Sequence, residues 1–248
     1  MSTGKPLRLR RIFTRGRALI VDCDPCPADL LSKVRLLARS EVDGIALTPG
    51  VLDVVAEELG ALSVILRIDG KTHRGQQLIS VQAAMEMGAE AVSVGVATGG
   101  PRTEEALERF GRVTEDARRL GMPVLAEVYG EDWLEAARLA ADYGADVIQA
   151  RFVPGRSSFR SFARLTGRAF LATVEEFRLG PQGLLAVANE AIEEAAHGLV
   201  LGSGVLEQSE CAGLLKAVHA LVHQGVSVDE ALALSEKSGV RSQESEEG

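Results

Sequence analysis

The chain has 248 residues, of which 46% are hydrophobic and 25% charged, and its formal net charge is −8. This composition is typical of a soluble globular protein with enough apolar residues for a substantial core. The negative charge argues against a general nucleic-acid binder, which needs a basic face for its phosphate contacts.

The N-terminal residues 5–11 are locally basic, but no long apolar stretch follows them. We therefore expect no signal peptide, and no later segment is long and apolar enough to cross a bilayer. These observations predict a cytoplasmic protein.

Short apolar runs alternate with helical patterns along the chain. The predicted strands are 17–24, 44–48, 63–69, 91–97, 123–129, 147–153, 169–174 and 198–202. The predicted helices are 29–41, 51–59, 80–87, 103–120, 132–143, 157–165, 181–196 and 209–223. A last helix, 227–235, precedes a polar tail, 236–248, which we expect to be disordered.

Eight β–α units with almost continuously apolar strands predict a parallel sheet covered by helices. At this chain length, eight units in a row favour a closed barrel over an open sheet. No linker or shift in composition divides the chain. We therefore predict an α/β fold, a (β/α)8 TIM barrel that forms a single domain over residues 1–235.

In such a barrel the active site lies at the C-terminal ends of the strands, and side chains of one parity point inwards. The residues expected to converge there are Asp22, Asp24, Arg67, Asp69, Lys71, Glu127, Tyr129, Gln149 and Arg151. Burying such groups unpaired costs several kcal/mol each, so the set predicts a ligand-binding site. For Arg67 and Glu127, an internal salt bridge that fills the barrel is an equal alternative.

The three cysteines are too few for a disulfide framework in a chain of this length. Cys23 and Cys26 are spaced C-x-x-C, but zinc takes three or four ligands and the sequence shows no second Cys/His cluster. His219 and His223, four residues apart, are interpreted as a half-exposed structural pair. We expect neither a metal nor a cofactor.

Several segments resemble the archaeal-type class I fructose-bisphosphate aldolases, and also the related aminodideoxyheptulosonate synthases and autoinducer-2 phosphate thiolases. The matching pieces, in order and over nearly the whole chain, are LRRIFTRGRALIVDCD, DGIALTPGVL, GAEAVSV, GMPVLAEVY, GADVI and GLVLGSGVLEQ. The resemblance implies a barrel that acts on a small-molecule carbonyl substrate. It also implies an oligomer, built from copies of this chain or shared with a homologous aldolase subunit.

In those aldolases a lysine on the sixth strand forms a Schiff base with the ketone, while a strand-one aspartate and a strand-five tyrosine handle protons. The resemblance places the aspartate at Asp24, the tyrosine at Tyr129 and the lysine at Gln149. An amide nitrogen is not nucleophilic and cannot form an imine. The family's Asp-His-Gly after strand one is also changed here, to Asp24-Pro25-Cys26.

The phosphate site implied by the resemblance is altered as well. Gly202, Ser203 and Gly204 keep the glycine-rich character of the loop after strand eight, although Ser203 replaces the family's arginine. After strand seven the expected Ala-Gly-Gly turn is replaced by a Thr-Val-Glu sequence that ends at Glu175. A carboxylate at that position repels phosphate.

Two functions remain open from the sequence. In the first, an enzyme of the aldolase superfamily acts on a small carbonyl compound: Asp24 and Tyr129 move a proton beside the carbonyl, and Arg67 and Arg151 hold an anionic group. Lys71 is then a candidate for a displaced Schiff-base lysine. In the second, the chain is a non-catalytic paralogue that binds or assembles with an active aldolase.

Overall fold

A computed structural model describes residues 3–70, 76–101, 103–130, 132–155, 159–175 and 179–244. Its eight parallel strands follow one another around a closed barrel, and β8 pairs with β1. The strands are β1 (Ala18–Asp22), β2 (Gly44–Leu47), β3 (Ser63–Arg67), β4 (Ala91–Ala97), β5 (Val124–Tyr129), β6 (Val147–Arg151), β7 (Ala169–Val174) and β8 (Gly198–Leu201). The predicted single-domain TIM barrel is confirmed.

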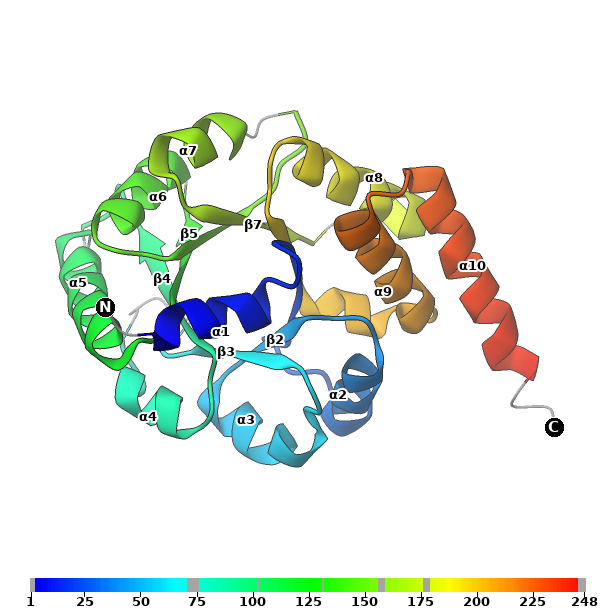
Figure 1. Ribbon diagram of the computed structural model, residues 1–248, viewed down its shortest axis with the longest axis horizontal. Coiled ribbons are helices and arrows are strands. Elements are labelled where there is room, and N and C mark those ends of the chain that lie inside the picture. Colours follow the sequence, from blue (N-terminus) through cyan, green and yellow to red (C-terminus); the bar gives the residue numbers. More distant parts are fainter. Residues whose placement is uncertain are drawn as a thin grey trace.

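Helices surround this barrel (Figure 1). They are α1 (Gly4–Ile12), α2 (Leu30–Arg39), α3 (Pro49–Val55), α4 (Val81–Glu86), α5 (Thr103–Leu120), α6 (Trp133–Asp142), α7 (Phe159–Thr166), α8 (Gly180–Glu193), α9 (Cys211–His219) and α10 (Val228–Glu244). Short 3-10 turns η1 (Ala56–Glu58) and η3 (Ser203–Glu207) and a π-helical turn η4 (Ala220–Gln224) complete the described elements. No helix in the described ranges is both long and apolar enough to cross a bilayer.

Two helix predictions need correction. Helix α1 was not expected, because four of its nine residues are basic and it lacks a clear apolar period. Helix α10 continues to Glu244, past the boundary predicted at residue 235. Its later part extends away from the barrel (Figure 1). Disorder of the final residues stays a prediction.

The barrel interior is apolar in its lower half and polar in its upper half. The lower layer is formed by Ile20, Ala46, Ile65, Ala91, Leu125, Val147, Leu171 and Val200. Because strand side chains repeat every two residues, the next inward positions lie two residues further along each strand. At seven of the eight strands these positions carry polar side chains: Asp22, Thr48 (directly after β2), Arg67, Ser93, Glu127, Gln149 and Thr173. The strand pattern therefore builds a polar floor at the C-terminal mouth.

A ring of polar side chains closes the opposite, N-terminal end. Each of these residues directly precedes an even-numbered strand. Its side chain accepts a hydrogen bond from a backbone N–H near the start of the neighbouring odd-numbered strand. The pairs are Asp43 with Leu19 at 2.7 Å, Glu90 with Val64 at 3.0 Å, Asp146 with Val124 at 2.9 Å and His197 with Phe170 at 3.2 Å. These bonds satisfy N–H groups at the strand starts, which are costly to bury unpaired.

Helix α1 lies across this end of the barrel (Figure 1). Its apolar residues Leu9 and Ile12 pack on the lower interior layer. Its cations pair with the polar ring: Lys5 Nζ lies 2.8 Å from Asp146 Oδ2, and Arg11 Nη1 lies 3.6 Å from Glu90 Oε1. The basic N-terminal run is therefore explained by acids that are far away in the sequence.

We predict that Asp146→Ala lowers the free energy of unfolding by about 1–3 kcal/mol, because it leaves the Val124 N–H unsatisfied and removes the partner of Lys5. The control is Asp142→Ala on α6, which removes an exposed carboxylate paired with Arg138 and should cost about 1 kcal/mol or less. Urea unfolding measures both. Equal losses would show that the ring does not stabilise the barrel.

Candidate functional site

Arg67 is the centre of the polar floor at the C-terminal mouth. Its side chain is 4% exposed and contacts three carboxylates from two other strands and the segment after β1. Nη1 donates a short hydrogen bond to Glu127 Oε2. Nη2 lies 3.3 Å from Asp22 Oδ2, and Nε lies 3.6 Å from Asp24 Oδ2. The structure thus brings together four of the residues predicted for the site.

Burial by itself lowers the pKa of Arg67, but Glu127 and Asp22 outweigh it and raise that pKa above its ordinary value. The guanidinium is therefore a permanent cation held by the protein's own carboxylates. Its contacts with Glu127 and Asp22 form the internal salt bridge that was one of the two alternatives for this residue. Binding of an anionic substrate group by Arg67 stays a prediction.

A second cluster surrounds Asp69, which is buried just beyond β3. Asp69 Oδ2 accepts the N–H of Gly95 on β4 at 2.9 Å and lies 3.6 Å from Arg109 Nη2. Arg109 also donates to Gly95 O at 3.1 Å. Burial raises the pKa of Asp69, although the Gly95 N–H and Arg109 oppose the shift.

Tyr129, at the end of β5, belongs to this second cluster. A Cβ placed on Gly95 would lie 2.8 Å from Tyr129 Oη and 3.3 Å from Asp69 Oδ2, so both groups adjoin the same glycine. Partial burial raises the pKa of Tyr129, and Asp69 raises it further. The other charged groups that act on the phenol are Arg109, Glu127 and Arg67. Tyr129 and Asp69 thus share the neighbourhood of Gly95, and proton transfer by Asp24 and Tyr129 stays a prediction.

Sequence reasoning did not identify Gly95 and Arg109. A glycine inside a strand pattern indicates a close approach by another group, so Gly95 carried a usable signal. Arg109 carried none, because it lies on α5 among other charged residues and its side chain reaches the strand ends only in the folded chain.

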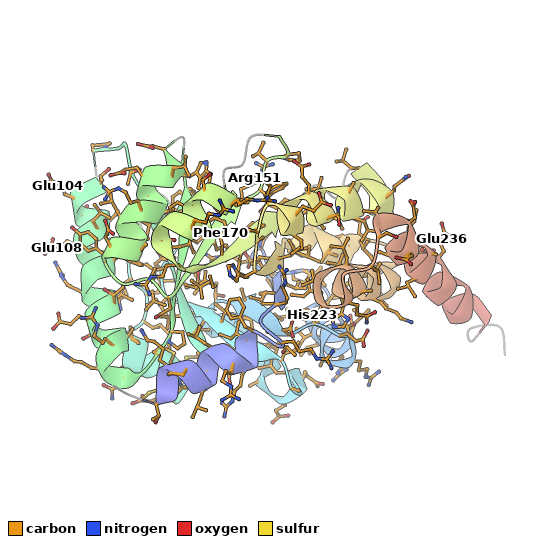
Figure 2. All side chains as sticks on the ribbon, turned by 45° about the horizontal axis from the view of Figure 1, so that its top comes forward. Glu104, Glu108, Arg151, Phe170, His223 and Glu236 are labelled. Atoms are coloured by element: carbon orange, nitrogen blue, oxygen red, sulfur yellow. The ribbon has the colours of Figure 1, made fainter. Side chains whose placement is uncertain are left out.

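Gln149, on β6, occupies the position that the resemblance assigns to the lysine. Its side chain is buried, and its Nε2 donates to Thr173 Oγ1 on β7 at 3.1 Å. The strand register sets Glu127 beside it on β5. Arg151, two residues further along, is exposed at the strand end on the upper side of the barrel (Figure 2).

The loops after β7 and β8 lie beside each other, since Gly202 N donates to Val174 O at 3.3 Å. Gly202 caps the short turn η3, which begins with Ser203 and Gly204. Glu175 is exposed directly after β7. Lys71, predicted as a substitute nucleophile, lies outside the described residues, and its role stays a prediction.

The histidine pair lies at the other end of the barrel. His223 Nε2 is 2.8 Å from Asp43 Oδ2, and its ring stacks on His219 at 4.6 Å between centroids. The side chains are 4% and 18% exposed, so the pair is more buried than expected. Burial and His223 lower the pKa of His219. Among the residues that the structure describes, no group of three or more His, Cys, Asp or Glu is arranged to hold a metal ion.

We predict that Cys26 is the fast-reacting thiol of the folded protein. Cys23 and Cys211 are buried, and burial raises the pKa of Cys23 to about 12 and that of Cys211 to about 11. Both therefore stay protonated and unreactive at neutral pH, whereas Cys26 is exposed. Titration with a thiol reagent should show one rapid equivalent that Cys26→Ser removes. Rapid loss of two thiols would contradict this, and the denatured protein provides the three-thiol control.

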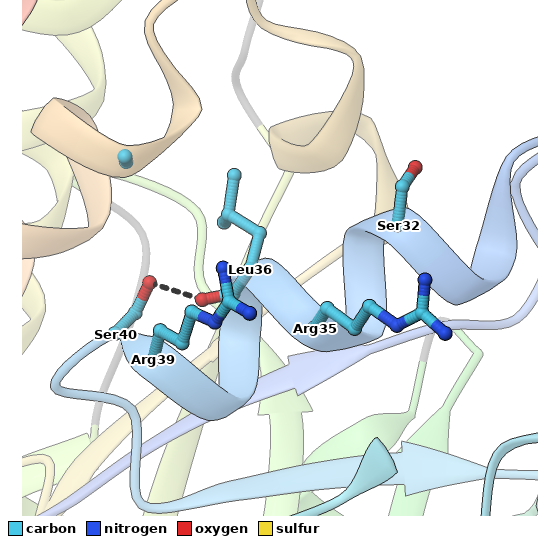
Figure 3. Close-up of a pocket in the computed structure, with 6 residues that line it drawn as sticks. Ser32, Arg35, Leu36, Arg39 and Ser40 are labelled. Atoms are coloured by element: carbon cyan, nitrogen blue, oxygen red, sulfur yellow. Dashed lines mark hydrogen bonds between the residues drawn. The ribbon is translucent and has the colours of Figure 1, made fainter. Parts of the chain in front are cut away.

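A groove of about 410 Å³ lies between α2 and α9, outside the barrel (Figure 3). Its lining is Ser32, Arg35, Leu36, Arg39, Ser40 and Ala212. Arg35 is held there by Glu58, with Nη2 to Oε1 at 2.6 Å, and Ser40 Oγ donates to Leu36 O at 2.8 Å. The groove contains none of the residues predicted for the site.

Comparisons with known proteins agree with the fold. The chain is 27% identical to the 2-amino-3,7-dideoxy-D-threo-hept-6-ulosonate synthase of Halobacterium salinarum, over 93% of this chain and 96% of that protein. A second synthase of that kind, from Archaeoglobus fulgidus, is 26% identical over 92% and 95%.

Solved structures show the same barrel. An archaeal fructose 1,6-bisphosphate aldolase superposes with a TM-score of 0.78 at 22% identity, over 88% of this chain and 99% of that one. The fructose-bisphosphate aldolase of Slackia heliotrinireducens gives 0.80 at 16% identity, over 96% and 92%. The relatives and the fold together support an aldolase or synthase function. Residues 24–229 match the model of the DeoC/LacD family aldolases, and the chain belongs to that family.

Proposed function

We propose that this protein is an aldolase-type enzyme that acts on a small carbonyl compound without a lysine imine on β6. It forms or breaks a carbon–carbon bond, or isomerises its substrate, through an enolate. The observation that carries the proposal is the composition of the mouth. Its carboxylates and phenol are retained at the strand ends, while Gln149 holds an amide where the resemblance expects the amine.

Loss of a proton from the carbon beside a carbonyl needs a base near that carbon and a donor near the carbonyl oxygen. Tyr129 is a suitable donor, because its raised pKa keeps the phenol protonated. Carboxylates at the strand ends are the candidate bases, with Asp24 as the residue implied by the resemblance. Arg151, exposed at the rim of β6, is the other candidate for an anionic group of the substrate.

The named relatives act at carbonyl carbons of sugar-like molecules, which supports a small hydroxylated aldehyde or ketone as the substrate class. Phosphorylated substrates are disfavoured here, because the exposed Glu175 adjoins the Gly202 loop. We therefore predict no cleavage of fructose 1,6-bisphosphate in an assay that couples triose phosphate release to an indicator enzyme. Robust turnover would contradict this role of Glu175, and Glu175→Gln is the control that should raise any residual activity.

The test of the function is proton exchange in heavy water. Acetone, hydroxyacetone, dihydroxyacetone, pyruvate and glyceraldehyde are incubated with the protein, and loss of the proton beside the carbonyl is followed by NMR. We expect exchange of at least one compound well above the rate in buffer, and its loss in Tyr129→Phe. No exchange over the whole panel would remove the proposal.

Borohydride trapping separates this chemistry from imine catalysis. If Lys71 forms a Schiff base, water leaves as the imine forms and borohydride adds two hydrogens, so the peptide that contains Lys71 gains the mass of the ketone less one oxygen atom. We expect the protein to exchange protons without being trapped. Trapped protein that loses the adduct in Lys71→Arg would assign the chemistry to Lys71 instead.

A second candidate is a non-catalytic paralogue that binds or assembles with an active aldolase. It is favoured by the engagement of Arg67 with three protein carboxylates, an arrangement that also serves a purely structural role. This candidate predicts neither exchange nor trapping, together with a stable complex with a homologue that retains the strand-six lysine. Size-exclusion chromatography of the mixed proteins measures such a complex.

A further inference from the structure

The environment of Tyr129 contains a carboxylate that the resemblance does not assign to proton transfer. Asp69 is 3% exposed, and Tyr129 is 51% exposed at the rim of the same mouth. Asp69 Oδ2 and Tyr129 Oη both adjoin Gly95, at 3.3 Å and 2.8 Å from the position that a Cβ would take there. Asp69 is therefore sheltered from water, Tyr129 is exposed to it, and both lie beside the same glycine.

Several contacts hold Asp69 in place. Its Oδ2 accepts the Gly95 N–H at 2.9 Å, and Arg109 lies 3.6 Å from the same oxygen while donating to Gly95 O. The Gly95 N–H and the Arg109 guanidinium thus both act on the same oxygen, Oδ2 of Asp69. Such restraint of a reacting group by surrounding residues is what a proton-transfer site requires.

We propose that Asp69 is the base that takes the proton from the carbon beside the substrate carbonyl, and that Tyr129 donates a hydrogen bond to the carbonyl oxygen. The inference rests on the proposed function. The electron pair of the C–H bond becomes the second bond between the two carbons, and the carbonyl π pair moves to oxygen. The proton resides on the Asp69 carboxyl and the enolate accepts the Tyr129 O–H, so return of the proton reverses the step.

Burial favours this assignment, because a base is most effective when its pKa approaches the working pH. The pKa of Asp69 is raised by its burial, whereas Asp24 lies beside the Arg67 guanidinium. Gly95 and Arg109 are positioning residues in this scheme. A side chain at residue 95 would enter the space of the phenol oxygen, and Arg109 aligns the carboxylate without reaching the substrate.

The first experiment tests the pairing without any substrate. The chain has two tyrosines, so Tyr143→Phe leaves Tyr129 as the sole phenol that titrates. The charged groups that act on Tyr129 are Asp69, Arg109, Glu127 and Arg67. Tyrosinate absorbance against pH should shift to lower pH in Asp69→Asn, which removes a negative neighbour, and to higher pH in Arg109→Met, which removes a positive one.

Asp24→Asn is the comparison for this titration, since Asp69 is the carboxylate that acts most strongly on the phenol. It should move the Tyr129 midpoint by less than Asp69→Asn does. A midpoint that moves with Asp24→Asn and stays fixed with Asp69→Asn would overturn the pairing. Circular dichroism over the same pH range confirms that each variant remains folded.

The second experiment tests the chemistry with hydroxyacetone as the probe and proton exchange as the measurement. Asp69→Asn should reduce the exchange rate by about 100-fold or more, the size expected when a general base is lost. Gly95→Ala should also reduce it, while Gly100→Ala, a glycine with open space around its Cβ position, should not. Full exchange by Asp69→Asn would overturn the catalytic role.

The outcomes of the two experiments distinguish failure of the proposed function from failure of the role of Asp69. No exchange by the parent protein on hydroxyacetone or on the rest of the carbonyl panel overturns the proposed function and the base role together, whatever the titration shows. Exchange by the parent that survives Asp69→Asn overturns the role of Asp69 alone. A folded Asp69→Asn variant with an unshifted Tyr129 midpoint overturns the electrostatic interaction between the two groups.

Discussion

Gln149→Lys should make the protein trappable by borohydride in the presence of a small aldehyde or ketone. The substitution places an amine on the inward side of β6, two residues before Arg151 and beside Glu127 in the strand register. Burial and Arg151 favour the neutral amine, which is the form that attacks a carbonyl, whereas Glu127 opposes them. A mass increase on the peptide that contains residue 149 measures the gain.

The control is Gln149→Arg, which brings a similar length and charge but forms no imine. Both variants bury a cation and lose the hydrogen bond to Thr173, so both should melt below the parent. A folded Gln149→Lys variant that cannot be trapped would contradict the hypothesis that the barrel mouth retains the geometry of an aldolase active site. That result would favour a pocket rebuilt for a different ligand.

Arg67→Met should cause a large loss of stability, about 3–5 kcal/mol in the free energy of unfolding at neutral pH. It removes the cation that Glu127, Asp22 and Asp24 share, and so leaves buried carboxylates without their partner. The pKa of Arg67 is raised in the folded state, so the guanidinium stays charged below the normal range for arginine and its own titration removes none of this contribution at neutral pH. Urea unfolding near neutral pH measures the deficit.

The deficit of Arg67→Met should shrink in acid. Without the guanidinium, the buried carboxyl groups bind protons more tightly in the folded state than in the unfolded chain. Lowering the pH therefore stabilises the folded variant. Stability relative to the parent is then recovered as the pH falls towards about 4 to 5, where carboxyl groups begin to protonate. Arg112→Met, which removes an exposed pair with Glu108 on α5, should cost about 1 kcal/mol or less. A similar loss in both variants would contradict the proposed electrostatic centre.

The barrel could be predicted from the sequence because its determinants are local. Almost continuously apolar runs alternate with helical patterns, and in Ala91–Ala97, Thr103–Leu120 and Ala169–Val174 even the boundaries agree with the structure. The inward parity followed for the same reason, since it depends only on the alternation of side chains along one strand. That parity placed Asp22, Arg67 and Glu127 in one mouth.

Helix α1 shows where local reasoning fails. The helix contains no acidic residue to pair with its basic ones. Lys5 and Arg11 instead form ion pairs with Asp146 and Glu90, which lie at the start of distant strands. The same limit applies to Arg109, whose side chain reaches Gly95 and Asp69 only when α5 packs on β4. Long-range ion pairs leave no periodic signal in a sequence.

The sequence by itself determined the fold, and it predicted which residues lie at the mouth; the lysine position at Gln149 stays an implication of the resemblance. Only the tertiary structure decided how those residues pair. Arg67 faces three carboxylates, and Tyr129 and Asp69 both adjoin Gly95. The reason is geometric: parity along a strand says which side chains point inwards, but the stagger between strands and the depth of each side chain set which charges meet.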